Sequence, residues 1–204
     1  MTKARLEAFS DGVVAILITI MVLELKVPHS AELEALGELT PVLLAYVLSF
    51  VNIGIYWNNH HHLLHAATHI SGGVLWANLH LLFWLSLVPF VTAWMGENHF
   101  QALPTAAYGV VLLFSAIAYM ILARALINAQ GKGGQLDQAI GRDLKGKLPL
   151  LLYGLAVPAA FVQTWIAYGL YITVALMWLI PDRRIEAKLS GPRLHGPAGR
   201  APPE

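Results

Sequence analysis

The sequence is a succession of apolar runs, each close to the length that crosses a lipid bilayer. A membrane-spanning helix needs about 20 consecutive, mostly apolar residues. Such runs cover residues 6–27, 41–62, 74–95, 103–127 and 148–180. Charged residues make up only 12% of the 204-residue chain, against about 25% in an average soluble domain. These features predict an all-α integral membrane protein embedded in a lipid bilayer.

The last apolar run is too long for a single crossing. A helix over 148–180 would be about 50 Å long at a rise of about 1.5 Å per residue, and Pro158 interrupts it. We therefore expect two short spans, 148–162 and 164–180, joined by a tight turn near Gln163. With this division the chain has six transmembrane helices.

The basic residues favour six crossings and predict an orientation. With six crossings, both termini and the second and fourth loops lie on one side of the membrane. Lys26 is the only one of the 13 lysines and arginines that falls on the other side. Because basic residues concentrate on the cytoplasmic side, we expect both termini to be cytoplasmic. Five helices would instead place Arg183 and Arg184 outside.

A single transmembrane domain, residues 1–189, accounts for nearly the whole chain. Glu7 and Asp11 interrupt the approach to the first run and no small-residue cleavage site follows it, so we expect no cleaved signal peptide. Residues 190–204 are rich in proline and glycine, which predicts a disordered cytoplasmic tail. The chain has no cysteine, which excludes disulfides and thiolate sites.

The first apolar run begins with two polar residues, Ser10 and Asp11. Ionisable groups at membrane depth usually face a bundle interior or a water path, so they mark a candidate functional site. Five residues then share one stripe at helical spacing, with Gly12 one turn before the first of them: Ile16, Thr19, Ile20, Leu23 and Val27. An ordinary packing face has the same spacing, with Thr19 bonded back to a carbonyl of the preceding turn. Spacing alone leaves both interpretations open.

A histidine cluster, His60, His61, His62, His65 and His69, ends the second run. Three of them, His61, His65 and His69, are four residues apart and share a face if the helix continues that far, which suits a metal or haem. With His80 of the third run, the cluster supports an alternative function as a membrane-embedded haem- or metal-binding protein. Otherwise the imidazoles lie at the cytoplasmic interface and bond to backbone or to Ser10 and Asp11. No carboxylate lies within the cluster to orient a ligand histidine.

Catalytic motifs do not occur in the sequence. It has no glycine-rich phosphate loop after a strand, no His-Glu-x-x-His and no Gly-x-Ser-x-Gly. No serine, histidine and aspartate are spaced so as to poise a nucleophile beside a base. We expect no enzymatic activity and no nucleic-acid partner. A secondary transporter is also disfavoured, because the two halves of the chain do not repeat.

Several motifs resemble those of one family of channels. They are Arg5-x-x-x-Phe9-Ser10-Asp11, then Ala15-Ile16, Thr19 and Leu23-Glu24, then Trp57-x-x-His60-His61, and the Pro-Asp-Arg-Arg ending of the last run. This set resembles the signature of the transmembrane protein 175 family of potassium channels. A single six-helix unit is similar to the prokaryotic branch, which implies the cell membrane of a prokaryote.

The resemblance implies a homotetramer in which the first helix of each subunit lines a central pore. On that pattern Ile16 forms the narrow constriction, Ile20 and Leu23 form further apolar rings, and Thr19 supplies a ring of selective hydroxyls. The polar network that holds the pore helix would comprise Arg5, Phe9, Ser10, Asp11, His60 and His61. Asp11 would serve either in this network or as a charge at the cytoplasmic pore mouth.

Such a pore predicts a moderate preference for potassium. Isoleucine offers no oxygen to replace the hydration of an ion, and an apolar constriction can gate by dewetting. Potassium loses water more readily than sodium, so hydroxyls beside the constriction would favour potassium. Four carboxylates near the external mouth, Glu24, Glu32, Glu34 and Glu38, would attract monovalent cations. We expect a potassium channel moderately selective over sodium, with no cofactor beyond the permeant ions.

Overall fold

The computed structural model describes residues 2–28, 30–130 and 144–179, and every regular element within these ranges is an α-helix. The helices are α1 (Lys3–Leu23), α2 (Leu33–His65), α3 (Gly72–Ser86), α4 (Val88–Glu97), α5 (Ala102–Gln130), α7 (Leu144–Val162) and α8 (Thr164–Leu179). Helices satisfy their own backbone polar groups, as a hydrocarbon environment requires. The all-helical class expected from the apolar runs is confirmed. The tail at 190–204 lies outside the described residues.

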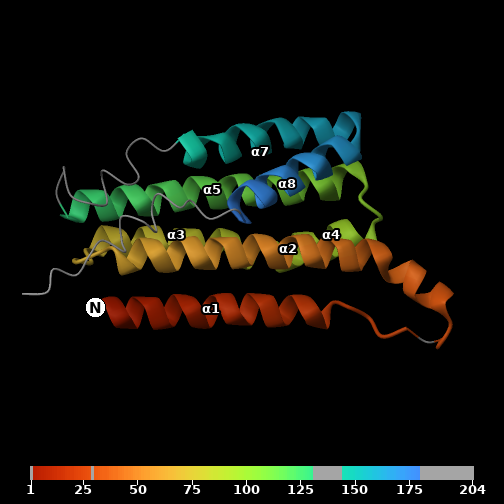
Figure 1. The fold of residues 1–204 in the computed structure, drawn as a ribbon, viewed down its shortest axis with the longest axis horizontal. Coiled ribbons are helices and arrows are strands. Elements are labelled where there is room, and N and C mark those ends of the chain that lie inside the picture. Colours follow the sequence, from red (N-terminus) through yellow and green to blue (C-terminus); the bar gives the residue numbers. More distant parts are fainter. Residues whose placement is uncertain (1, 29, 131–143, 180–204) are drawn as a thin grey trace, which may run out of the picture.

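The helices run up and down along one common direction (Figure 1). The start of α1, the end of α2, the end of α5 and the start of α7 lie at one end of the bundle. The start of α2, the end of α4 and the α7–α8 connection lie at the other end. Gln163 alone separates α7 from α8, where the sequence predicts a tight turn. This arrangement follows the expected alternation of crossings.

One crossing is built from two helices, α3 and α4. Pro89 lies in the first turn of α4 and has no amide hydrogen to continue the ladder from α3. The Leu87 amide instead bonds to the Trp84 carbonyl, three residues back, at 3.2 Å. The chain nevertheless continues in one direction, and Gly72–Glu97 forms a 26-residue apolar span.

Helix α2 differs from its expected span at both ends. It begins at Leu33, upstream of the apolar run, and Pro41 lies inside it, where Figure 1 shows the first turns at an angle to the rest. It ends at His65, with Ala66 as its C-cap. His69 therefore does not continue the face of His61 and His65, and the condition for a three-histidine face, a helix that extends to residue 69, is not met.

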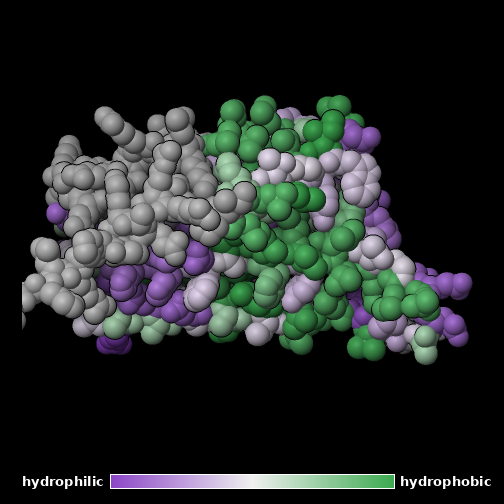
Figure 2. All heavy atoms as spheres, in the orientation of Figure 1, coloured by the Kyte–Doolittle hydropathy of each residue, from purple (hydrophilic) through white to green (hydrophobic). Residues whose placement is uncertain are grey.

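Length and hydropathy fit a bilayer for the described part of the chain. Four helical runs, α1, α2, α3 with α4, and α5, are long and apolar enough to cross a membrane. The apolar helices at 148–162 and 164–179 are shorter. Apolar atoms cover the middle of the bundle, and polar residues gather toward both of its ends (Figure 2).

Buried tyrosines fill the core between α5, α7 and α8. Tyr108, Tyr153 and Tyr171 are among the largest side chains with almost no exposed surface. The Tyr171 hydroxyl donates to the Thr105 carbonyl at 2.9 Å, and its ring meets Tyr108 edge-on with centroids 5.4 Å apart. Gly109 makes this packing possible, because a Cβ there would lie 3.0 Å from Tyr171 Cζ and still closer to its hydroxyl oxygen.

Helix α1 lies at the edge of the bundle and packs mainly on α2, α3 and α4. Its inner face buries Leu6, Ser10, Val14, Leu17 and Met21. Beyond its end, Lys26 forms an ion pair of 2.6 Å with Glu97 at the end of α4. The hydrogen bond to the Glu97 carboxylate raises the pKa of the Lys26 ammonium above its ordinary value. The ends of α1 and α4 are thus tied together by a solvent-exposed contact.

We expect Gly109→Ala to destabilise the fold, because the new methyl group would collide with the buried Tyr171 ring. Overpacking of this kind costs about 1–3 kcal/mol. Thermal unfolding in detergent, followed by circular dichroism, measures the effect. The control is Gly154→Ala, where no atom lies within 4 Å of the new Cβ. Equal melting temperatures for the two variants would contradict the packing argument, and Tyr171→Phe should partly rescue Gly109→Ala.

Candidate functional site: the outer face of the first helix and its polar contacts

The outer face of α1 has no partner within the described subunit. Ile16 is 57% exposed, Ile20 41% and Leu23 79%, and Thr19 is exposed on the same stripe. Val27 was expected on this stripe, but α1 ends at Leu23, so Val27 does not belong to the helical face. The opposite face is buried against α2, α3 and α4. One face of α1 therefore attaches the helix to the bundle, and the other face stays exposed in the described part of the subunit.

Thr19 is the polar residue in the middle of this stripe. Its hydroxyl donates back to the carbonyls of Ala15, at 3.0 Å, and Ile16, at 2.9 Å. A hydroxyl has one donor hydrogen and two acceptor lone pairs. Because the hydrogen is directed to the helix backbone, the oxygen can act as an acceptor toward whatever faces the stripe. Such an oxygen can accept a hydrogen bond or ligate a cation.

A buried chain of hydrogen bonds attaches the start of α1 to α3 and α2. Asn78 donates from its amide nitrogen to Ser10 Oγ at 3.0 Å, and its amide oxygen lies 2.7 Å from His60 Nε2. Ser10 in turn donates to the Leu6 carbonyl at 2.9 Å. Since the Asn78 oxygen can only accept, this orientation of the amide assigns the proton to His60 Nε2. All three side chains are buried, so each satisfies the others away from water.

Two further contacts join α1 to α2 at the same end of the bundle. The Trp57 indole nitrogen donates to Asp11 Oδ1 at 3.0 Å. Lys3 donates to the His65 carbonyl at 2.7 Å, at the end of α2. A carboxylate and an ammonium group of α1 are therefore both engaged by α2. Unlike the Ser10–Asn78–His60 chain, these contacts are exposed.

The expected network residues thus have different surroundings. The structure brings Ser10 and His60 together through Asn78, and it brings Asp11 to Trp57. His61 is exposed and stacks on Trp57, with ring centroids 6.2 Å apart. Phe9 and Arg5 point outward, and Arg5 makes no hydrogen bond or ion pair with any described residue. Membership of Arg5, Phe9 and His61 in the polar network remains a prediction. The outward-facing side chains of Arg5 and Phe9 are open to contacts outside the described subunit.

Sequence reasoning missed the roles of Asn78 and Trp57. Asn78 is an amide in the middle of an apolar run, and a polar group at membrane depth needs a partner from another helix. That signal was available, but the partner was not, because Ser10 lies 68 residues away in the chain. Trp57 stands near the end of its run, where aromatic residues are common at membrane interfaces, so its indole donor carried no special signal.

The histidines do not converge on one centre. His60 is bonded to Asn78, and His80 accepts from the Trp84 indole at 3.0 Å. His61, His62 and His65 are exposed. Within the described ranges, no group of three or more histidine, aspartate or glutamate side chains is placed to hold a metal ion. This arrangement gives no support to the alternative of a haem or metal protein built on this cluster.

A second polar cluster lies deep between α2, α4 and α5. Ser49 Oγ lies 2.6 Å from Thr92 Oγ1 and donates to the Tyr108 hydroxyl at 3.0 Å. Asn52 donates to the same hydroxyl at 3.4 Å, and Tyr153 of α7 donates to Asn52 Oδ1 at 3.5 Å. Such interhelical bonds are common in membrane bundles, where they hold helices together. The cluster joins α2, α4, α5 and α7, and α1 packs on the bundle that contains them.

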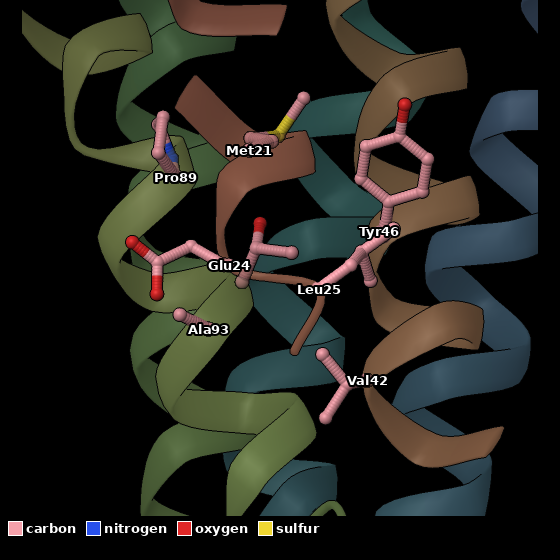
Figure 3. Close-up of a pocket in the computed structure, with 8 residues that line it drawn as sticks. Met21, Glu24, Leu25, Val42, Tyr46, Pro89 and Ala93 are labelled. Carbon is pink, nitrogen blue, oxygen red and sulfur yellow. The ribbon is translucent and has the colours of Figure 1, made fainter. Parts of the chain in front are cut away.

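A shallow apolar hollow marks where the end of α1 rests on the bundle (Figure 3). It is lined by Met21, Glu24, Leu25, Val42, Tyr46, Pro89, Thr92 and Ala93. The lining residues come from the end of α1, from α2 and from α4. Glu24 is its one carboxylate and is exposed, so it can interact with cations in solution at this end of α1.

We expect Asn78→Leu to destabilise the subunit, because Ser10 and His60 would each lose a buried partner. Leaving a buried polar group unpaired costs about 1–3 kcal/mol. The measurement is the melting temperature of the detergent-solubilised protein. Asn58→Leu is the matched control, since Asn58 is exposed on α2. A melting temperature equal to that of the control would show that the Ser10–Asn78–His60 chain contributes nothing to stability.

Known proteins share the segment that carries these contacts. The profile of the family described as endosomal/lysosomal potassium channel TMEM175 matches residues 5–89. A potassium channel of Chryseobacterium sp. (strain P1-3) is 52% identical over 189 residues, which cover 93% of this chain and 98% of the relative. The endosomal/lysosomal proton channel TMEM175 of Gallus gallus is 33% identical over 145 residues, 63% of this chain and 29% of the relative.

A solved structure shares the fold. The crystal structure of a lysosomal potassium-selective channel TMEM175 homolog from Chamaesiphon minutus superposes with a TM-score of 0.77 at 28% identity, and covers 91% of this chain and 98% of its own. The resemblance inferred from the Arg5–Asp11 motif is confirmed. The matched family is one of ion channels rather than enzymes, as expected. With its sequence matched over nearly its full length and its fold matched as well, this chain belongs to the TMEM175 family of potassium channels.

Proposed function

We propose that this chain conducts potassium, in preference to sodium, through a pore lined by the outer face of α1 in a homotetramer. The observation that carries the proposal is the composition of that face. Three apolar side chains, Ile16, Ile20 and Leu23, are left exposed by the subunit, and a hydroxyl lies among them. In a pore lined by this face, Thr19 would supply an oxygen beside the apolar constriction at Ile16.

Assembly around an axis accounts for the edge position of α1. A helix attached to its own subunit by one face can turn the other toward identical copies. The Ser10–Asn78–His60 chain and the Trp57–Asp11 bond lie to the inner side and would hold the angle of α1 in each copy. The tetramer itself rests on resemblance to the family, and a native mass measurement in detergent tests it.

At the constriction, the Ile16 side chain would narrow the pore and offers no oxygen atom to bind an ion. A ring of isoleucines forces an ion to lose part of its hydration and excludes water when narrow. Thr19 follows within one turn, and its oxygen has lone pairs to offer because its hydrogen is held by the helix backbone. Partial dehydration followed by hydroxyl ligation favours potassium over the more strongly hydrated sodium. The preference is moderate because no carbonyl cage surrounds the ion.

The charges at the two ends of α1 fit cation conduction with cytoplasmic termini. At the end near Glu24, the single basic residue Lys26 is paired with Glu97, which leaves the other carboxylates of that loop to set the local potential. At the opposite end lie Lys3 and Arg5. Basic residues at that end match the cytoplasmic side of a prokaryotic cell membrane.

We expect Ile16→Asn to raise cation flux and weaken the preference for potassium, because an amide at the constriction would keep it hydrated. The measurement is potassium and sodium flux from liposomes that contain the purified protein, with a proton-sensitive dye in a parallel arm. Leu155→Asn is the control. Leu155 is 52% exposed, similar to Ile16, and lies on α7 at the far edge of the bundle from α1.

No cation flux from folded wild-type protein would overturn the proposed channel. An equal change of cation flux in Ile16→Asn and Leu155→Asn would show that Ile16 does not form the constriction. Proton flux without potassium flux would reassign the permeant ion to the one named for the Gallus gallus relative.

We expect Thr19→Val to lower the potassium-to-sodium permeability ratio while the protein still conducts. Valine keeps the shape of threonine and removes the oxygen that would ligate a partly dehydrated ion. Reversal potentials in planar bilayers under mixed-ion conditions measure the ratio. Thr173→Val is the matched control, because Thr173 on α8 is also exposed and bonded to the helix carbonyl four residues back, at 2.7 Å. An unchanged ratio in Thr19→Val would exclude its hydroxyl from selection.

A further inference from the structure

The exposed histidines at the end of α2 include one pair at the sequence spacing of a chelate. His61 and His65 are one helical turn apart, and their rings stack with centroids 6.0 Å apart and an interplanar angle of 20°. Both are exposed, and neither imidazole has a hydrogen-bond partner among the described residues. Two histidines at this spacing on one helix face are a recurrent means of holding a transition metal.

We propose that His61 and His65 bind a divalent transition-metal ion such as Zn²⁺ at the end of α2. Metal–nitrogen bonds of about 2.0–2.1 Å require the two nitrogens to approach to about 3.3 Å in a tetrahedral arrangement. Because both rings are exposed, they can rotate to reach that separation without moving the backbone. Water completes the coordination. Imidazole ligands select zinc, copper or nickel, whereas magnesium and calcium prefer oxygen.

The surroundings of the pair support a site of this kind. The Trp57 indole stacks on His61 at 28° with ring centroids 6.2 Å apart, so an aromatic ring adjoins the proposed site. Lys3 bonds to the His65 carbonyl, which keeps the last turn of α2 formed and His65 in register with His61. The same indole donates to Asp11 Oδ1 at 3.0 Å, so a carboxylate of α1 contacts the ring that stacks on His61.

This site differs from the redox or metal centre considered for the whole cluster. His60 and His80 are engaged by Asn78 and Trp84, so they are not ligands. Two protein ligands give a solvent-accessible site with exchangeable metal rather than a permanent cofactor. Its occupancy would stabilise the last turns of α2, which carry the contacts to Lys3 and, through Trp57, to Asp11.

Isothermal titration calorimetry with ZnCl₂ tests the proposal on intact protein that carries no polyhistidine tag and has been washed with chelator. We expect saturable binding of one Zn²⁺ per chain. His61→Ala and His65→Ala should each weaken binding at least as much as loss of an outer-shell partner does, about tenfold to a hundredfold. His69→Ala is the matched control, because His69 is also exposed but lies beyond the end of α2.

Absence of saturable Zn²⁺ binding would overturn the proposal, as would an equal loss in all three variants, which would indicate scattered surface histidines. A second measurement follows from the stacking of Trp57 on His61. Cu²⁺ should quench more tryptophan fluorescence in the wild type than in Trp57→Phe. When both proteins also carry His65→Ala, Cu²⁺ should quench them equally. Equal quenching in the wild type and Trp57→Phe would contradict the placement of the metal.

Discussion

The structure depends on the absence of water at membrane depth. A polar side chain in a spanning helix must find its partner on another helix or on its own backbone, because lipid offers none. Two buried clusters meet this constraint. One joins Ser10, Asn78 and His60, and the other joins Ser49, Thr92, Tyr108 and Asn52. The first positions α1, and the second makes a firm support of the helices behind it.

The division of α1 into two faces follows from the same constraint. Its inner face carries Ser10, whose hydroxyl is satisfied by Asn78 and by the Leu6 carbonyl. Its outer face carries Thr19, whose hydrogen is satisfied locally and whose oxygen is left open. Both residues obey the rule that donors are paired, but only one leaves an acceptor facing away from the subunit. That difference separates a hydroxyl that joins two helices from one whose oxygen stays open, which is the property that the proposed pore would use.

Much of the fold could be predicted from the sequence, because apolar length and charge asymmetry are local signals. The turn at Gln163 and the face shared by Ile16 and Leu23 needed only helical geometry. The pairing of polar residues could not be predicted in the same way. Trp57 meets Asp11 across 46 residues of chain, and no periodicity specifies which helices become neighbours. Whether His69 shares a face with His61 and His65 depended on where the helix ends, and helix ends are the least predictable part of an element. The helix ends at His65.

The two ends of α1 are held by bonds of different character. The end at Ser10 is tied by hydrogen bonds buried away from water, where they are electrostatically strong. The connection beyond the other end is tied by the Lys26–Glu97 pair, whose side chains are 76% and 46% exposed and which dissolved salt screens. Of the polar contacts of α1, the one beyond its far end is therefore the more sensitive to salt, and the buried Met21 is the attachment there that salt does not screen. The stripe from Ile16 to Leu23 lies between these two kinds of attachment, and Leu23 is the member nearest to the salt-sensitive one.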